Sequence, residues 1–107
     1  MERITERIVT GFYAPGSRLP SVRELAFEAA VNPNTMQRAL SALESGGLIY
    51  SERTSGRFVT DSGAQIERAR EQLAEENAAV FFAAMAKLGY TGEEALQIAS
   101  QMKEVNE

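Results

Sequence analysis

The segment from Asn32 to Leu43 carries amide, hydroxyl and guanidinium side chains in a pattern that suits hydrogen bonding to nucleic acid. After Pro33, apolar residues recur at i, i+3, i+4 and i+7, a spacing that places them on one face of a helix. These apolar residues are Met36, Ala39, Leu40 and Leu43. The opposite face consists of Asn34, Thr35, Gln37, Arg38 and Ser41. Amide and guanidinium groups hydrogen-bond base edges in the major groove, and hydroxyl groups donate to phosphate. The sequence therefore predicts a DNA recognition helix here.

Other chemistries lack the residues that they need. The 107-residue chain contains no cysteine and no histidine, which excludes disulfides, thiolate ligands and a histidine-based catalytic relay. No nucleophile–base pair, metal-binding cluster or phosphate-binding loop is evident, and Gly46-Gly47 is typical of a helix end. We therefore expect no catalytic residues, no metal and no cofactor.

The chain also lacks the sequence features of a membrane protein. No apolar run approaches the roughly 20 residues that span a bilayer, and the N-terminal residues lack the apolar core of a signal peptide. We therefore expect a cytoplasmic protein with no membrane partner.

A second helix and a tight turn are expected to hold the recognition helix in place. Ser21-Val22-Arg23-Glu24 has the spacing of a capping box, in which the serine and glutamate side chains each bond the other residue's backbone N–H. The helix that follows repeats the same apolar spacing, at Val22, Leu25, Ala26 and Ala29. Asn32 is a good N-cap and Pro33 suits the first position of the next helix. Two short helices joined by a turn of three or four residues predict a helix-turn-helix.

The flanking segments extend this motif to a winged helix. Met1 to about Phe12 is expected to be a helix that ends at Gly11 and the following turn. After Gly46-Gly47, Leu48–Tyr50 and Arg57–Thr60 have strand-like composition on either side of a glycine-containing turn. Helix, helix-turn-helix and hairpin in this order predict a winged helix in which the hairpin is the wing. Arg53 and Arg57 flank the wing tip, where they could reach phosphates or a minor groove.

The C-terminal part is expected to form two more helices. Residues 64–88 are rich in Ala, Glu, Arg and Gln, and Thr91–Glu94 is a second capping box that opens a final helix. Their apolar stripe is larger than one short partner helix can cover, which favours a second copy of the chain as the cover. The expected dimer contacts are Leu73, Val80, Phe81, Phe82, Met85, Leu88, Ile98 and Met102. The predicted fold class is therefore mainly α with a small β-hairpin: a winged helix-turn-helix domain over residues 1–60, then a two-helix dimerisation segment over residues 61–107.

The charge of the chain is divided between these two parts. The net charge is −4. Residues 1–60 carry seven basic and six acidic side chains, whereas residues 61–107 carry four basic and nine acidic ones. The acidic part is therefore expected to face away from DNA. The weak positive charge of residues 1–60 predicts binding that depends on shape and a few arginines.

Several motifs in residues 1–60 resemble the GntR family of bacterial transcription regulators. They are Pro15–Ala26, Val31–Thr35 with Arg38-Ala39, Leu43-Glu44, Gly46–Ile49 and Gly56–Thr60. The short helical tail, with its Leu88–Thr91 break, is similar to the YtrA subfamily. This resemblance implies a homodimeric repressor at a palindromic operator, often in its own operon beside an ABC transporter. By motif position it also implies DNA contacts at Arg23, Asn34, Thr35, Gln37, Arg38 and Gly56. Ser21, Arg53 and Arg57 complete the candidate DNA contacts.

The sequence departs from the family pattern in three places. Members usually begin earlier, so the first helix is expected to be shortened. An aromatic residue is common where Leu40 stands. The wing usually reads Arg-Gly-Lys/Arg-Gly, whereas this one reads Arg53-Thr54-Ser55-Gly56, with one glycine and one basic residue fewer.

Each candidate contact has a structural alternative. Arg38 and Arg23 could pair with neighbouring acids instead of DNA, and Asn34 or Thr35 could cap their own helix. Arg53 and Arg57 could be ordinary exposed hairpin residues.

Alternatives also remain for the tail and for the whole protein. Phe81, Phe82 and Met85 could line a ligand pocket instead of a dimer interface. The alternative function is a winged-helix module that binds protein without specific DNA binding. The sequence does not identify an operator or a small-molecule effector.

Overall fold

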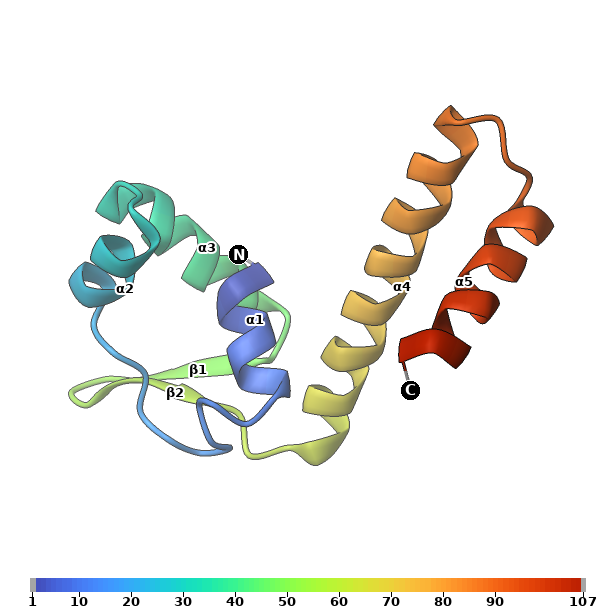
Figure 1. The fold of residues 1–107 in the computed structure, drawn as a ribbon. Helices are drawn as coiled ribbons and strands as arrows, with labels where there is room; N and C mark the ends of the chain where they lie inside the picture. Colours follow the sequence, from blue (N-terminus) through green and yellow to red (C-terminus); the bar gives the residue numbers. More distant parts are fainter. Residues whose placement is uncertain (1, 107) are drawn as a thin grey trace. The chain divides into compact units, whose positions relative to one another are not determined.

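The computed structural model describes residues 2–106, with side chains described for residues 3–103. The described residues form five helices and a two-stranded antiparallel sheet (Figure 1). In chain order these are α1 (Glu2–Val9), α2 (Val22–Ala29), α3 (Pro33–Ser45), β1 (Ile49–Glu52), β2 (Gly56–Val59), α4 (Gly63–Lys87) and α5 (Gly92–Asn106). The predicted fold, a mainly α winged helix-turn-helix with a small hairpin and C-terminal helices, is confirmed.

The chain divides into two compact units, Met1–Glu71 and Gln72–Glu107. The division lies inside α4, because Ile66 and Ala69 in the first turns of that helix pack against the core of the first unit. The predicted boundary between a DNA-binding domain of residues 1–60 and the following segment stays a prediction. The assignment of residues 61–107 to dimerisation stays a prediction.

One hydrophobic core holds the first unit together. The side chains of Ile8, Met36, Leu40, Ile49 and Val59 are almost completely buried in it. They come from α1, α3 and both strands, and Leu25 and Ala26 add the inner face of α2. Figure 1 shows α1, α2 and α3 grouped around the hairpin. The apolar spacing correctly predicted the burial of Leu25, Ala26, Met36 and Leu40. The other positions of the two apolar faces are only half-buried: Val22, Ala29, Ala39 and Leu43.

The first helix ends earlier than the sequence pattern indicated. α1 stops at Val9, and Gly11 then adopts a φ of 85° that a helix cannot contain. Phe12, the expected last residue of the helix, therefore lies outside it and is 68% exposed. The next residue, Tyr13, packs against the core instead. Its hydroxyl accepts a 3.1 Å hydrogen bond from Arg7, which also pairs with Glu28 of α2 at 3.3 Å.

Both predicted helix starts in the helix-turn-helix are confirmed. Ser21 Oγ accepts from the Glu24 backbone N–H, and the Ser21 N–H donates to the Glu24 carboxylate at 3.0 Å. The bond from the Ser21 N–H is the main cause of a lowered pKa of Glu24, because it stabilises the ionised carboxylate. Asn32 caps α3 by accepting from the Asn34 N–H at 2.7 Å. Between the helices, Ala30 adopts a left-handed conformation with φ 56° and ψ 42°.

The wing differs from a plain two-stranded hairpin. β1 and β2 are antiparallel, with Ile49 opposite Val59 at one end of the hairpin and Glu52 opposite Gly56 at the other. The segment Ser17–Leu19 lies along the other edge of β2, with Arg18 opposite Phe58. Hydrogen bonds join Leu19 N–H to Arg57 C=O at 2.8 Å and Val59 N–H to Ser17 C=O at 2.9 Å. This third extended segment was not predicted.

Glycines end α3 before the wing, and a serine caps the start of α4 after it. Of the two glycines after α3, Gly47 adopts the left-handed conformation that commonly ends a helix (φ 82°), whereas Gly46 has a right-handed one. A Cβ at Gly47 would lie 3.1 Å from the Gln65 side chain. Ser62 caps α4 by accepting from the Gln65 N–H at 3.2 Å.

The second unit contains the rest of α4 and all of α5. The Thr91–Glu94 capping box opens α5, with bonds of 2.9 and 3.1 Å. Ala95 is completely buried, and Phe81 stacks edge-on against Phe82.

Candidate nucleic-acid interface

The outer face of α3 is a row of exposed polar side chains. Asn34, Thr35, Gln37 and Arg38 are all exposed. None of the four side chains makes a hydrogen bond or ion pair with any described residue. Asn32 provides the helix cap, so capping does not occupy Asn34 or Thr35. The donors and acceptors of this face are therefore available to a ligand.

The start of α2 carries a further exposed basic side chain. Arg23 is exposed and makes no ion pair within the described chain, because Glu24 is bonded to Ser21 and Glu28 to Arg7. The acids that could have neutralised Arg23 thus have other partners. Ser21 is exposed as well, although its hydroxyl already caps α2.

The two wing arginines differ from each other. Arg53 lies in the turn between the strands and is exposed, with no partner among the described residues. Arg57 points back to α3, where its Nε lies 3.5 Å from the Glu44 carboxylate and its side chain is only 21% exposed. Ser51 of β1 also donates to Glu44, at 3.0 Å. Glu44 of α3 thus contacts both wing strands, through the bond from Ser51 and through an ion pair with Arg57, whose buried Nε forms no hydrogen bond with the described residues.

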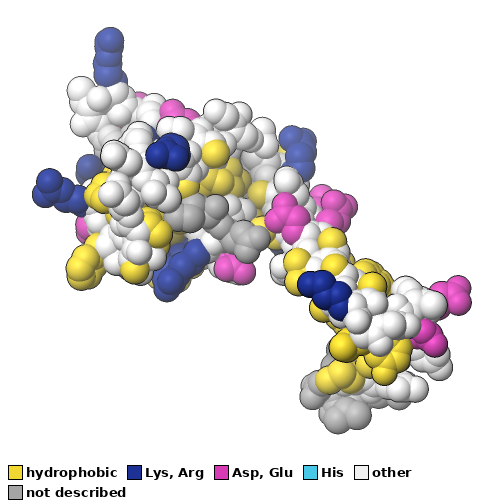
Figure 2. Space-filling view, turned by 90° about the horizontal axis from the view of Figure 1, so that it is seen from above, with side chains coloured by type: hydrophobic (Ala, Val, Ile, Leu, Met, Phe, Trp, Pro, Cys, Tyr) yellow, Lys and Arg dark blue, Asp and Glu magenta, His cyan; other side chains and the backbone are white. Residues whose placement is uncertain are grey.

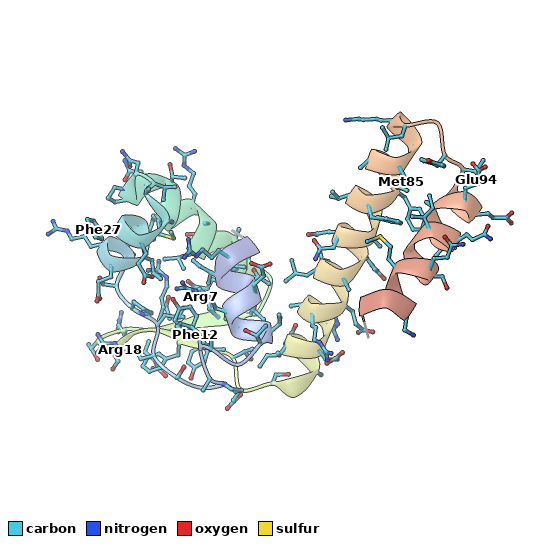
Figure 3. The ribbon with its side chains drawn as sticks, in the orientation of Figure 1. Arg7, Phe12, Arg18, Phe27, Met85 and Glu94 are labelled. Carbon is cyan, nitrogen blue, oxygen red and sulfur yellow. The ribbon has the colours of Figure 1, made fainter. Side chains whose placement is uncertain are left out.

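Two features of this surface were missed by the sequence analysis. Arg18 lies beside the wing, with its Nε 3.2 Å from the position of a Cβ on Gly56. Figure 3 shows Arg18 next to the hairpin. Nothing in the spacing of Pro15–Pro20 indicated this pairing. The Glu44–Arg57 pair joins residues that only the winged-helix fold brings together, although their opposite charges were a usable signal once that fold was predicted.

The exposed arginines of the first unit that have no partner in the described chain, and not its net charge, suit a polyanionic ligand. Figure 2 shows Lys and Arg side chains projecting from this unit at separate points. Basic side chains on a DNA-binding surface neutralise phosphates and release counterions. Amides and guanidinium groups on an exposed helix can read base edges in the major groove. The arrangement therefore suits phosphate contacts by arginine and base contacts by α3.

The described part of the chain offers no alternative chemistry. No group of three or more acidic residues in it could hold a metal ion. None of its helices has the length and apolarity needed to span a membrane.

The expected dimer contacts lie in or next to the second unit with varied exposure. Val80, Leu88 and Met102 are 69%, 73% and 57% exposed. Leu73, Phe81, Phe82, Met85 and Ile98 are half-buried. Figure 2 shows hydrophobic side chains over the surface of this unit, and Figure 3 shows Met85 of α4. Leu96, at 58%, is a further exposed hydrophobic that the sequence analysis did not select.

A helix-turn-helix whose second helix has an exposed polar face, followed by a wing, is the architecture of winged-helix DNA-binding proteins. Comparison with known proteins gives the family. Residues 1–59 match the bacterial regulatory proteins of the gntR family. The HTH-type transcriptional regulator YhcF of Bacillus subtilis is 36% identical over 96 residues, which cover 90% of this chain and 79% of YhcF. The chain therefore belongs to the GntR family.

Two further relatives are informative. The HTH-type transcriptional repressor YtrA of Bacillus subtilis is 37% identical over 62 residues, which cover 58% of this chain and 48% of YtrA. The structure of a GntR family transcriptional regulator from Listeria monocytogenes superposes with a TM-score of 0.78 at 38% identity, covering 96% of this chain and 88% of that one. The similarity thus includes the C-terminal helices. The family and these relatives are transcriptional regulators and not enzymes, which makes this chain a DNA-binding transcriptional regulator.

Proposed function

We propose that this protein is a homodimeric repressor that binds a palindromic operator, with residues 1–60 contacting DNA and residues 61–107 holding the dimer. The observation that carries the proposal is the face of α3, where four polar side chains are exposed and have no partner in the described chain. Repression is supported by the similarity to YtrA, which is named a repressor. Regulators of this kind often control their own operon beside an ABC transporter, and we propose the same context here.

The apolar surface of the second unit supports dimerisation. Val80, Leu88 and Met102 are each more than half exposed, and exposed apolar patches often mark interfaces. A two-fold dimer carries two recognition helices related by symmetry, which match the two halves of a palindrome.

Fluorescence anisotropy tests the DNA-binding part of the proposal. The full chain is titrated against the duplex upstream of its own gene and against a scrambled duplex, at several salt concentrations. We expect a strong preference for the upstream duplex and a steep loss of affinity with salt, because phosphate contacts release counterions. Equal and weak binding to both duplexes would contradict the operator assignment and favour a protein-binding module.

A variant pair assigns the base contact. Arg38→Ala is expected to weaken operator binding roughly 5- to 150-fold, because a bidentate arginine–base contact is worth about 1–3 kcal/mol. It should also reduce the preference over the scrambled duplex. Arg68→Ala, an exposed arginine of α4 outside the proposed interface, is the charge-matched control and should lose little. The same preference in Arg38→Ala as in the wild type would exclude a base contact by Arg38.

A second pair tests the dimer interface by sedimentation equilibrium. Leu88→Gln removes a proposed interface residue, whereas Leu96→Gln changes a leucine of similar exposure that was not assigned to the interface. Burying a leucine is worth about 1.5–3 kcal/mol, so Leu88→Gln should raise the dimer dissociation constant at least roughly tenfold. A monomeric wild-type protein, or equal effects of the two variants, would refute this interface.

A further inference from the structure

The segment before α2 is part of the wing. Arg18 forms a bridge with Phe58 of β2, and the hydrogen bonds of its neighbours Ser17 and Leu19 fix its backbone on both sides. The position of the Arg18 Cα is therefore set by the wing and not by a free loop.

The Arg18 side chain lies over the glycine at the wing tip. A Cβ on Gly56 would lie 3.2 Å from Nε and 3.5 Å from Nη2 of Arg18. The 3.2 Å distance is tighter than most real Cβ contacts, whereas 3.5 Å is an ordinary contact, so a Cβ at position 56 would shift the guanidinium by a few tenths of an ångström. Gly56 also has a φ of 103°, which disfavours other residues.

The guanidinium of Arg18 is exposed and available. It makes no ion pair or hydrogen bond with the part of the chain that the structure describes. Arg18 lines one surface depression with Ser21 and Glu24 at the start of α2. Its positive charge contributes to the lowered pKa of Glu24, after the larger effect of the Ser21 hydrogen bonds. Arg18 thus lies between the wing tip and the N-terminus of α2.

The two strands and the turn of the wing carry only one arginine without a partner in the described chain. Arg57 is held by Glu44, and the turn residues Thr54 and Ser55 are uncharged. Of the arginines on β1, β2 and their turn, only Arg53 has no partner in the described chain. An arginine beside the strands would restore the missing positive charge.

We propose that Arg18, carried by the Ser17–Leu19 segment and seated on Gly56, contacts a DNA phosphate and gives the wing a second unpaired basic side chain beside Arg53. This inference rests on the proposed DNA binding. Arg18 was not among the DNA contacts that the family resemblance or the recognition helix implied.

The expected loss of DNA affinity on removing the Arg18 contact follows from counterion release. Each phosphate contact contributes about 0.9 to the slope of log K against log salt, so losing one should cost roughly 15-fold in affinity at 50 mM salt and roughly fourfold at 200 mM. The preference for operator over scrambled duplex should not change, because a phosphate contact carries no sequence information. Arg18→Gln is therefore measured against both duplexes by anisotropy over this salt range.

The control is Arg68→Gln, which makes the same charge change on α4. Its slope and affinity should stay close to those of the wild type. Circular dichroism melting checks that Arg18→Gln folds, which is expected because the side chain is exposed. A wild-type protein without salt-dependent DNA binding would overturn the proposed function and this inference together. Wild-type binding with equal slopes for Arg18→Gln and Arg68→Gln would overturn only the role of Arg18.

A double-mutant comparison tests the seat on Gly56. Gly56→Ala should weaken DNA binding in the wild-type background, because the added Cβ shifts the Arg18 guanidinium. In the Arg18→Gln background the same substitution should cost several-fold less. Equal losses in the two backgrounds would show that Gly56 does not position Arg18.

Discussion

Replacing Ala30 by glycine should stabilise the protein, because Ala30 occupies a conformation that suits glycine. It lies in the turn of the helix-turn-helix with φ 56° and ψ 42°, where it ends α2. A left-handed conformation costs an L-residue roughly 1–2 kcal/mol, which glycine avoids. The Ala30 side chain is exposed, so losing its methyl group removes little buried surface.

The net gain is smaller than this conformational cost. Glycine makes the unfolded chain more flexible, which costs about 0.4–1 kcal/mol. The free energy of unfolding should therefore rise by about 0.5–1 kcal/mol in Ala30→Gly. For a unit of this size, that corresponds to an increase in Tm of about 2–8 °C. The Ala30 N–H bonds to Ala26 and Phe27, which the backbone of glycine can keep.

Urea and thermal unfolding at equal protein concentration measure this difference. Ala42→Gly provides the matched control, because it makes the same chemical change at an exposed position inside α3. There glycine should destabilise by roughly 1 kcal/mol. A loss of stability in Ala30→Gly, or the same sign of change in both variants, would refute the argument that the Ala30 backbone is strained.

Two further predictions concern Glu44 and Glu24. Glu44→Gln should lower the free energy of unfolding by up to about 1 kcal/mol, because it removes the charge that pairs with Arg57, whereas its amide oxygen can still accept the hydrogen bond from Ser51. Urea unfolding measures this loss beside Ser51→Ala, which removes only the hydrogen bond. A Glu44→Gln variant as stable as the wild type would mean that the ion pair contributes nothing. The pKa of Glu24 is lowered in the folded state, mainly by the backbone hydrogen bond from Ser21. The stabilisation by the Glu24 carboxylate is therefore complete above the ordinary pKa of 4.5, and it is lost as the pH falls through the lower pKa of the folded state. The stability difference between wild type and Glu24→Gln should therefore shrink below pH 4.5, and a pH-independent difference in urea unfolding would contradict this linkage.

The helices of the winged unit were predictable because their signals are local. Capping at Ser21–Glu24 and at Asn32 depends on residues within one turn, and the apolar spacing alone placed Met36 and Leu40 in the core. The end of α1 was less predictable, because apolar spacing extended the helix to Phe12 whereas Gly11 broke it earlier.

The wing was only partly predictable because its contacts are non-local. The strand composition and Gly56 indicated the hairpin, but the pairing of Arg18 with Phe58 and of Glu44 with Arg57 arises from the packing of the whole unit. The same applies to the candidate site. Local pattern selected Asn34 and its neighbours on α3, whereas the environment of each arginine required coordinates.

The Ser17–Leu19 segment along β2 has a consequence for how the protein folds. An isolated two-stranded hairpin is only marginally stable in water, and this one gains its third partner from a segment far earlier in the chain. Closing that large loop costs chain entropy before the strands pair, and such non-local pairing is slow. The wing should therefore form late in folding, after α2 and α3 have packed and brought the two segments together. Local opening at Ser17–Leu19 would also release β2, so the wing and the residues leading into α2 should open and close as one cooperative unit.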